Sequence, residues 1–260
     1  MRHSVAYTIF FAGAVCVVCA ILVSTSAVSL SELQDANATL DKRRNVLLAA
    51  GLIDSSRGVS AEDVEKLFKN VSSLVIDLES GEPAPDVNVD AYDQQKAKSD
   101  PALSREAPPN SAVIKRLPQY AVVYHVLGEQ GDVEMIVLPI EGYGLWSTLY
   151  GFLALDADAK TIRGLTYYQH GETPGLGGEV DNPRWKGLWP GRIAFDDSGE
   201  VVIEVIKGQA GPAEADPHQV DGLAGATITS RGVTNMLRFW LGANGFATYL
   251  KNYHQGRSER

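Results

Sequence analysis

An uncharged, apolar run near the N-terminus sets this chain apart from an ordinary globular domain. Residues 4–31 contain no charged side chain, and residues 5–23 are almost wholly apolar or small. A helix of about 20 such residues spans the hydrocarbon core of a bilayer. A cleaved signal peptide is the alternative, because residues 25–27 are small enough for a cleavage site, but the run exceeds a usual signal h-region. We predict a retained transmembrane anchor over residues 1–30.

The charges beside this run leave its orientation open. Arg2 and the amino terminus precede it, whereas Lys42, Arg43 and Arg44 follow it within the range where positive charge matters. Counted alone, these charges put the large C-terminal part in the cytoplasm. The sequence by itself does not decide the orientation.

Composition excludes several kinds of function. The net charge of -9 argues against a nucleic-acid partner, which requires a basic surface. Cys16 and Cys19 form a Cys-x-x-Cys inside the apolar run, a spacing that also occurs in metal and redox pairs. Because no further ligands lie nearby in the sequence, we interpret them as small apolar residues on one helix face. The rest of the sequence therefore has neither a disulfide framework nor a cysteine-ligated iron–sulfur cluster. A nucleotide-binding Gly-x-Gly-x-x-Gly between a strand and a helix is also missing from the sequence, so we expect no NADH site.

Two short helices are expected after the anchor. Residues 41–50 are typical of a helix that Gly51 ends. Residues 60–63 resemble a capping box. The helix that they begin shows apolar residues at helical spacing, namely Val64, Leu67, Phe68 and Val71.

A proline-rich, polar stretch follows at residues 81–118. Because prolines recur along it among charged residues, we interpret it as a surface excursion with little regular structure. Together with the two helices it makes up a juxtamembrane segment, residues 31–119.

Strand patterns begin at residue 120. Residues 120–127 and 133–140 flank a Glu-Gln-Gly-Asp turn and predict a hairpin. Strands are also predicted at residues 146–156 and 161–170. A second hairpin is predicted from residues 192–195 and 200–207 around an Asp-Asp-Ser-Gly turn.

Residues 230–241 predict the best helix of the chain, and Gly242 provides its end. Its apolar face comprises Val233, Met236, Leu237, Trp240 and Leu241. Hairpins followed by a helix indicate an α+β domain over residues 120–260, with an antiparallel sheet and flanking helices.

Residues 221–230 read Asp-Gly-Leu-Ala-Gly-Ala-Thr-Ile-Thr-Ser, just before this helix. Gly225 and Ala226 leave the hydroxyl of Thr227 with little steric cover. The helix start offers unpaired N–H groups and the positive end of the helix dipole to a phosphate. We expect Thr229 or Ser230 to cap the helix and to donate to the phosphate.

Asp221 has two interpretations in this stretch. Its carboxylate either shapes the turn by accepting from backbone N–H groups or helps to bind a metal during attachment of a ligand. The stretch as a whole also has a simpler interpretation, a small-residue turn that caps a helix and binds nothing.

The stretch resembles the flavinylation motif of the FMN-binding domain family, in which FMN is joined through its phosphate to a threonine. The resemblance implies that Thr227 is the acceptor. The family usually has Ser or Thr where this chain has Ala224, so a nearby hydroxyl is missing while the nucleophile is kept. Within that family the chain is similar to the C subunits of the sodium-translocating NADH:quinone oxidoreductases, most strongly over residues 142–250.

A second segment, residues 170–179, is rich in Gly and Pro and follows a predicted strand. Its bare backbone amides can donate to a flat ring, although a plain connecting loop fits the pattern too. The segment resembles the second flavin-contacting loop of the family. The resemblance implies that Glu172 and Thr173 contact the ring or the ribityl chain, and that Leu176 packs on the isoalloxazine beside Gly175.

Three further residues lie in or near these segments. Trp146, in a stretch at 142–147 that also resembles the family, either stacks on the flavin or fills the core. Lys207 either pairs with the phosphate or the pyrimidine side of the flavin, or is a solvated lysine at a strand end. We interpret His170 as structural.

The resemblance implies a single-pass flavoprotein of the bacterial inner membrane, whose FMN domain is periplasmic. Such a protein belongs to a complex of six subunits that oxidises NADH, reduces ubiquinone and exports Na⁺, and it is not active alone. It receives an electron from an iron centre in the membrane and passes it to another covalent FMN. A flavin transferase with FAD as donor modifies the threonine.

Two alternatives stay open at this stage. The G subunits of the Rnf-type ferredoxin:NAD oxidoreductases use the same motif with other partners. A flavin-free, membrane-anchored interaction domain would use the small-residue turn only as a helix cap.

Overall fold

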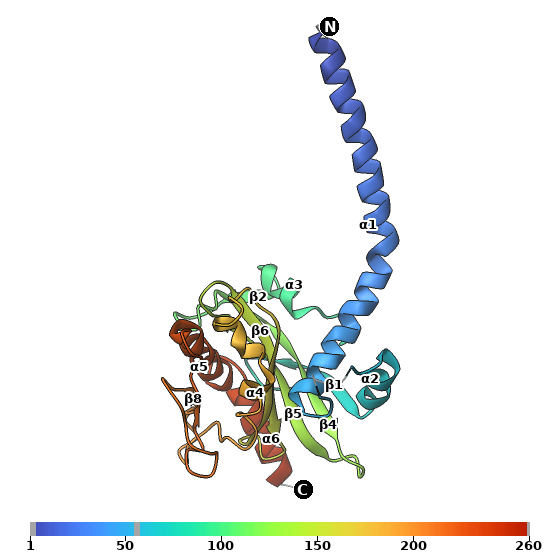
Figure 1. The fold of residues 1–260 in the computed structure, drawn as a ribbon. Coiled ribbons are helices and arrows are strands. Elements are labelled where there is room, and N and C mark those ends of the chain that lie inside the picture. The colour runs from blue at the N-terminus through green and yellow to red at the C-terminus, as the bar shows by residue number, and fades with distance from the viewer. Residues whose placement is uncertain (1–3, 55–57, 259–260) are drawn as a thin grey trace. The chain divides into compact units, whose positions relative to one another are not determined.

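The computed structural model describes residues 4–54 and 58–258. Arg2, which enters the charge comparison above, lies outside the described residues. The chain divides into two compact units, Met1–Lys42 and Arg43–Arg260. Figure 1 shows the ribbon of the chain, in which the second unit contains the sheet.

A single helix, α1 (Val5–Ala49), contains both the predicted anchor and the predicted helix at 41–50. The separation of these two helices was wrong, because no glycine or proline interrupts the sequence between Gly13 and Gly51. Gly51 ends α1 with φ +69°, which favours glycine. Among the described helices, α1 is the one long and apolar enough to cross a membrane.

Five antiparallel strands form the central sheet in the order β1-β4-β5-β6-β7. The predicted hairpin and the two strands after it are confirmed as β4 to β7. The strands are β1 (Val71–Asp77), β4 (Tyr120–Leu127), β5 (Val133–Tyr143), β6 (Thr148–Asp156) and β7 (Ile162–Gln169).

Strand β1 was not predicted. The capping box at Ser60 is confirmed, because its side chain accepts a hydrogen bond from the backbone of Asp63. The helix that it begins, α2 (Ala61–Phe68), ends before Val71, which was wrongly assigned to it. Val71 instead pairs with Val126 at the start of the β1–β4 ladder, so the sheet begins well before residue 120.

The proline-rich stretch holds more structure than predicted. It contains α3 (Gln94–Ser99), β2 (Ser104–Glu106) and β3 (Arg116–Pro118). Ala112 and Leu117 are buried in the core. The ammonium group of Lys98 lies 2.5 Å and 2.7 Å from the two carboxylate oxygens of Glu141 in β5, which fixes α3 to the sheet.

The second predicted hairpin is wrong. Its turn forms around the carboxylate of Asp196, but the flanking segments share one bridge, between Phe195 and Val201. After this bridge the second segment does not continue the hairpin. It forms β8 (Glu204–Val205), which pairs in parallel with β9 (Gln219–Val220). The other elements of this region are η1 (Gly177–Asp181), α4 (Pro183–Lys186), α5 (Thr227–Leu241) and α6 (Ala247–Ser258).

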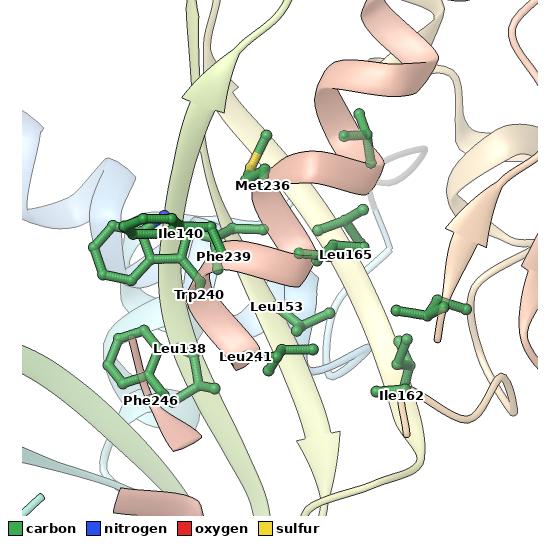
Figure 2. Packing of buried hydrophobic residues seen from close by; sticks show 14 of the residues in the cluster. Leu138, Ile140, Leu153, Ile162, Leu165, Met236, Phe239, Trp240, Leu241 and Phe246 are labelled. Carbon is green, nitrogen blue, oxygen red and sulfur yellow. The ribbon is translucent and has the colours of Figure 1, made fainter. Parts of the chain in front are cut away.

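Helices α5 and α6 lie on one face of the sheet (Figure 1). Figure 2 shows Met236 and Trp240 of α5 beside Ile140 of β5, and Leu241 beside Leu153 of β6. The predicted apolar face of α5 is confirmed, since all five of its residues are buried. The indole N–H of Trp240 also donates to the carbonyl of Glu141, 2.7 Å away, which aligns α5 with β5.

The opposite face of the sheet is covered by the end of α1 and by α2. Val46 and Leu47 are fully buried, and the guanidinium of Arg43 lies 5.1 Å from the ring centre of Phe68. Phe68 in turn meets Tyr124 of β4 edge to face. The sheet is therefore buried on both faces, and its loops are left to form the site.

Candidate functional site

Thr227 is the first residue of α5. The helix starts one turn earlier than predicted, and its N-cap is Ala226, which offers no side-chain hydrogen bond. The predicted cap at Thr229 or Ser230 is therefore wrong. No backbone acceptor is found in the described chain for the N–H groups of residues 227–229, as expected for a first helical turn.

The side chain of Thr227 is exposed, and small residues precede it. Gly225 has φ +71°, a conformation that costs glycine little. A Cβ atom at Gly225 would lie 2.9 Å from Cδ2 of Leu176, so the loop at 170–179 packs against this turn. The turn thus holds a hydroxyl at the surface, beside open N–H donors at the positive end of a helix.

Hydrogen bonds fix both ends of the 221–230 stretch. The carboxylate of Asp221 accepts from the backbone N–H of Ala210 at 2.9 Å, and its carbonyl accepts from the indole of Trp185 at 2.9 Å. Asp221 therefore fixes the stretch to the segment at Ala210, and not to a backbone N–H of its own turn as the first interpretation predicted. Further on, the hydroxyl of Ser230 accepts from the backbone N–H of Leu223 at 3.0 Å, which closes the turn onto α5.

Glu172 lies at the centre of three converging segments. Its Oε1 accepts from the backbone N–H groups of Leu145 at 3.0 Å, Trp146 at 2.9 Å and Ser147 at 3.4 Å. Its Oε2 accepts from the hydroxyl of Thr229 at 2.6 Å. The carboxylate thus joins the turn after β5, the loop after β7 and the first turn of α5.

The surroundings of Glu172 keep it ionised. Burial raises the pKa of the carboxyl group, but the hydrogen bonds from Thr229 and from three backbone N–H groups outweigh burial and lower it below its ordinary value. Only 6% of Glu172 is exposed, and Thr229 is fully buried.

Two glycines make room for this carboxylate. A Cβ at Gly144 would lie 2.6 Å from Oε1 of Glu172, and one at Gly177 would lie 2.4 Å from Oε2. Real Cβ atoms essentially never come so close to another heavy atom. The glycines of the two loops are therefore part of the same cluster.

Apolar side chains stand exposed on the segments that meet at Glu172. Trp146 is 64% exposed, Ile228 53% and Leu176 44%. Of the two interpretations of Trp146, core filling is excluded by this exposure. Exposed aromatic and aliphatic groups on segments that meet near an exposed hydroxyl suit a flat, largely apolar ring.

The remaining predicted residues lie in the same loops or close to them. Thr173 and Gly175 are exposed, and the carbonyl of Thr173 accepts from the N–H groups of Leu176 and Gly178. Lys207 is exposed just after β8, where backbone bonds join Ile206 and Gly208 to the segment that leads into the 221–230 stretch. In the described chain no ion pair involves Lys207, so its charge is open to an anion.

His170 is held from both sides, as its structural interpretation predicted. Its Nδ1 accepts from the backbone N–H of Glu172 at 3.2 Å, and its Nε2 lies 2.7 Å from Asp181.

Sequence reasoning missed Ser147 and Tyr143. The hydroxyl of Ser147 accepts from the backbone N–H of Gly171 at 2.6 Å, and the hydroxyl of Tyr143 donates to the carbonyl of Trp146 at 3.1 Å. Both bonds fix the turn that carries Trp146. The stretch at 142–147 resembles the family, but nothing local indicates which of its side chains face the loop at 170–179.

The comparisons with known proteins cover the segments that form this site. The family model of the FMN-binding domain matches residues 144–242, which include all three segments of the site. Two crystal structures share the fold. Shewanella oneidensis NqrC has a TM-score of 0.77 and 36% identity, covering 84% of this chain and 99% of that one. The C subunit of the Na(+)-translocating NADH-quinone reductase from Parabacteroides distasonis has a TM-score of 0.64 and 28% identity, covering 85% and 96%.

Two relatives match nearly the whole chain. The C subunit of the Na(+)-translocating NADH-quinone reductase of Pseudomonas aeruginosa is 46% identical, with 99% of each chain covered. Its counterpart of the same name in Yersinia pestis is 43% identical, with 98% of this chain and 95% of that one covered. This chain therefore belongs to the family of the C subunits of the Na(+)-translocating NADH-quinone reductases, and its domain is an FMN-binding domain of mixed helices and antiparallel sheet.

Proposed function

We propose that this chain is the FMN-carrying electron-transfer subunit of a sodium-translocating NADH:quinone reductase. Relatives of that name match it from end to end, which favours this assignment over the Rnf-type protein and over a flavin-free domain. Bound FMN supplies reversible electron transfer, while the chain holds the flavin and sets its surroundings.

In this proposal FMN is esterified through its phosphate to Thr227. The observation that carries the proposal is an exposed threonine at the first position of α5, beside N–H groups for which residues 4–54 and 58–258 provide no backbone acceptor. A phosphodiester at this position keeps a negative charge, which the open N–H groups and the helix dipole stabilise. A flavin transferase that uses FAD would form the ester and release the AMP half.

The exposed side chains around Thr227 have separate roles in binding. Trp146 and Leu176 offer apolar surface to the isoalloxazine, with Ile228 beside the attachment point. Thr173 and Gly175 present polar and backbone groups from the same loop, and Lys207 supplies a positive charge for the phosphate or the pyrimidine side of the ring. The first-turn residues Ala226, Thr229 and Ser230 contribute through the backbone and through packing of the turn.

The apolar part of α1 would anchor the chain in the bacterial inner membrane as a single span, with the FMN domain on the periplasmic side. There the protein would take an electron from an iron centre in the membrane part of a complex of six subunits. It would pass the electron to a second covalent FMN on a neighbouring protein of the complex. The length and composition of α1 support the anchor, and resemblance to the family supports the other steps.

Intact-mass measurement tests the attachment. The full chain, made in a host with an active flavin transferase, is expected to gain the mass of FMN less one water. Thr227→Val should lose the whole gain because it has no nucleophile, whereas Thr227→Ser should keep it.

Two results would contradict the proposal in different ways. A Thr227→Val protein that still carries the added mass would place the attachment on another residue. An unmodified wild-type chain in such a host would exclude the covalent flavoprotein.

A further inference from the structure

Glu172 is turned into the protein and not toward the surface on which Trp146 and Leu176 stand. Its two carboxylate oxygens accept four hydrogen bonds, and the residue is 6% exposed. A carboxylate so occupied has little capacity left for a ligand, because each oxygen already meets its donors inside the protein. Its role at this site must therefore be exerted through the residues that it holds.

The backbone around Glu172 is fixed as firmly as its side chain. The N–H of Gly171 donates to the hydroxyl of Ser147, and the N–H of Glu172 donates to Nδ1 of His170. The backbone N–H of Gly171 and the side chain of Glu172 thus both bind the loop at 170–172 to the turn at 145–147, whereas the bond from Glu172 to His170 holds the loop itself.

On its other side the carboxylate reaches α5. Thr229 follows Thr227 by two residues in the same first turn, and its hydroxyl donates to Glu172 over a sequence separation of 57 residues. The neighbouring Ser230 holds Leu223 on the other flank of Thr227. One buried carboxylate therefore touches both the turn that carries Trp146 and the helix start that carries Thr227.

We propose that Glu172 is a positioning residue for flavin attachment, whose buried carboxylate sets the separation between the turn that carries Trp146 and the helix start that carries Thr227. This inference rests on the proposed function. It implies that the surface for the ring and the anchor for the phosphate are arranged together before FMN arrives. A carboxylate suits this position because only acceptor atoms can meet four converging donors, whereas the amide of a glutamine brings donors of its own.

The test uses the full chain with FAD and the flavin transferase, at a temperature at which near-ultraviolet circular dichroism shows every variant folded. The rate of covalent FMN incorporation is followed by intact mass. Thr229→Val and Glu172→Gln are each expected to lower this rate by about tenfold, because one hydrogen bond to the buried carboxylate is lost or reversed. Thr229→Ser keeps the hydroxyl and should incorporate FMN at nearly the wild-type rate. If Thr229 contributed only by filling space, this difference between the serine and valine variants would not be expected.

Hydrogen exchange of the flavin-free protein supplies a readout that needs no FMN. Thr229→Val and Glu172→Gln are expected to speed exchange at the N–H groups of residues 145–147. Glu134→Gln, an exposed glutamate of β5, is the matched control and should change neither exchange nor incorporation.

The outcomes separate this inference from the proposed function. Wild-type incorporation that is lost in Thr227→Val but unchanged in both Thr229→Val and Glu172→Gln, with unchanged exchange, would overturn the positioning role alone. A wild-type chain that takes up no FMN would overturn both. If Glu172→Gln does not fold, the comparison of Thr229→Val with Thr229→Ser still tests whether the hydrogen bond to Glu172 is needed for the incorporation rate.

Discussion

Glu172 illustrates how the role of a residue depends on where its side chain points. Resemblance to the family implied a contact with the ring or the ribityl chain, but the structure directs the carboxylate to backbone N–H groups and to Thr229. A buried carboxylate is costly unless it is hydrogen-bonded, and here four donors offset that cost. The donors come from segments distant in sequence, so no local pattern indicates them.

The packing around this carboxylate gives a prediction at the same scale. In Gly177→Ala the new Cβ would lie 2.4 Å from Oε2 of Glu172 and 2.6 Å from the hydroxyl oxygen of Thr229. Because both neighbours are buried, we expect the free energy of unfolding, measured by urea denaturation, to fall by about 1–3 kcal/mol.

The matched control for Gly177 is Gly58→Ala, where a Cβ would meet no atom within 4 Å. This variant should unfold at nearly the wild-type urea concentration. Equal stability of the two variants would show that Glu172 and Thr229 can shift to accommodate a Cβ atom at position 177 at little cost in free energy, which would contradict this prediction.

Among the elements, α6 shows how a short C-terminal helix is held on the sheet. Nε2 of His125 in β4 lies 2.5 Å from the hydroxyl of Tyr249, and its ring also contacts the ring of Tyr253. Tyr249 and Leu250 are buried in the same core as α5. We did not predict α6 from the sequence, because the stretch is short. Its apolar residues can be recognised as a buried face only once they pack against β4.

The contact between His125 and Tyr249 predicts that the docking of α6 depends on pH. Burial lowers the pKa of His125, so the folded protein binds this proton less readily than the unfolded chain does. Stability from this group is complete above the unfolded value of about 6.5 and is lost as the pH falls below it. We expect hydrogen exchange in α6, corrected for intrinsic rates, to speed up between about pH 7.5 and 5.5.

His125→Gln removes the titrating group and should remove most of this pH dependence. His254→Gln is the control on α6 itself: its ring Nε2 lies 2.8 Å from the carbonyl of Asp158, to which a glutamine amide can still donate, and the variant should keep the pH dependence. A pH dependence that survives in His125→Gln would assign the effect to other groups.

At the scale of the whole molecule, the boundary between the two compact units falls inside α1. The units are Met1–Lys42 and Arg43–Arg260, so the last part of α1 belongs to the FMN-binding unit. Val46, Leu47 and Ala49 in that part are fully buried. The helix that would anchor the chain therefore also completes the core of the domain.

Two truncations test this boundary. Removal of residues 1–42 should leave a domain that unfolds cooperatively in urea, because its core is kept. Removal of residues 1–50 should lower the free energy of unfolding by several kcal/mol or prevent folding, since truncation of even one such buried side chain costs about 2–5 kcal/mol. Equal stability of the two truncated chains would show that the end of α1 contributes nothing to the domain.

Some features of this protein follow from its sequence alone because their signals are local. The length of an apolar run predicts the anchor, alternation predicts β4 to β7, and small residues around Thr227 mark the proposed attachment site. Other features were decided by tertiary contacts. Strand β1 exists because Val71 and its neighbours pair with β4. Glu172 turns inward because its donors, Thr229 among them, come together only in the folded chain.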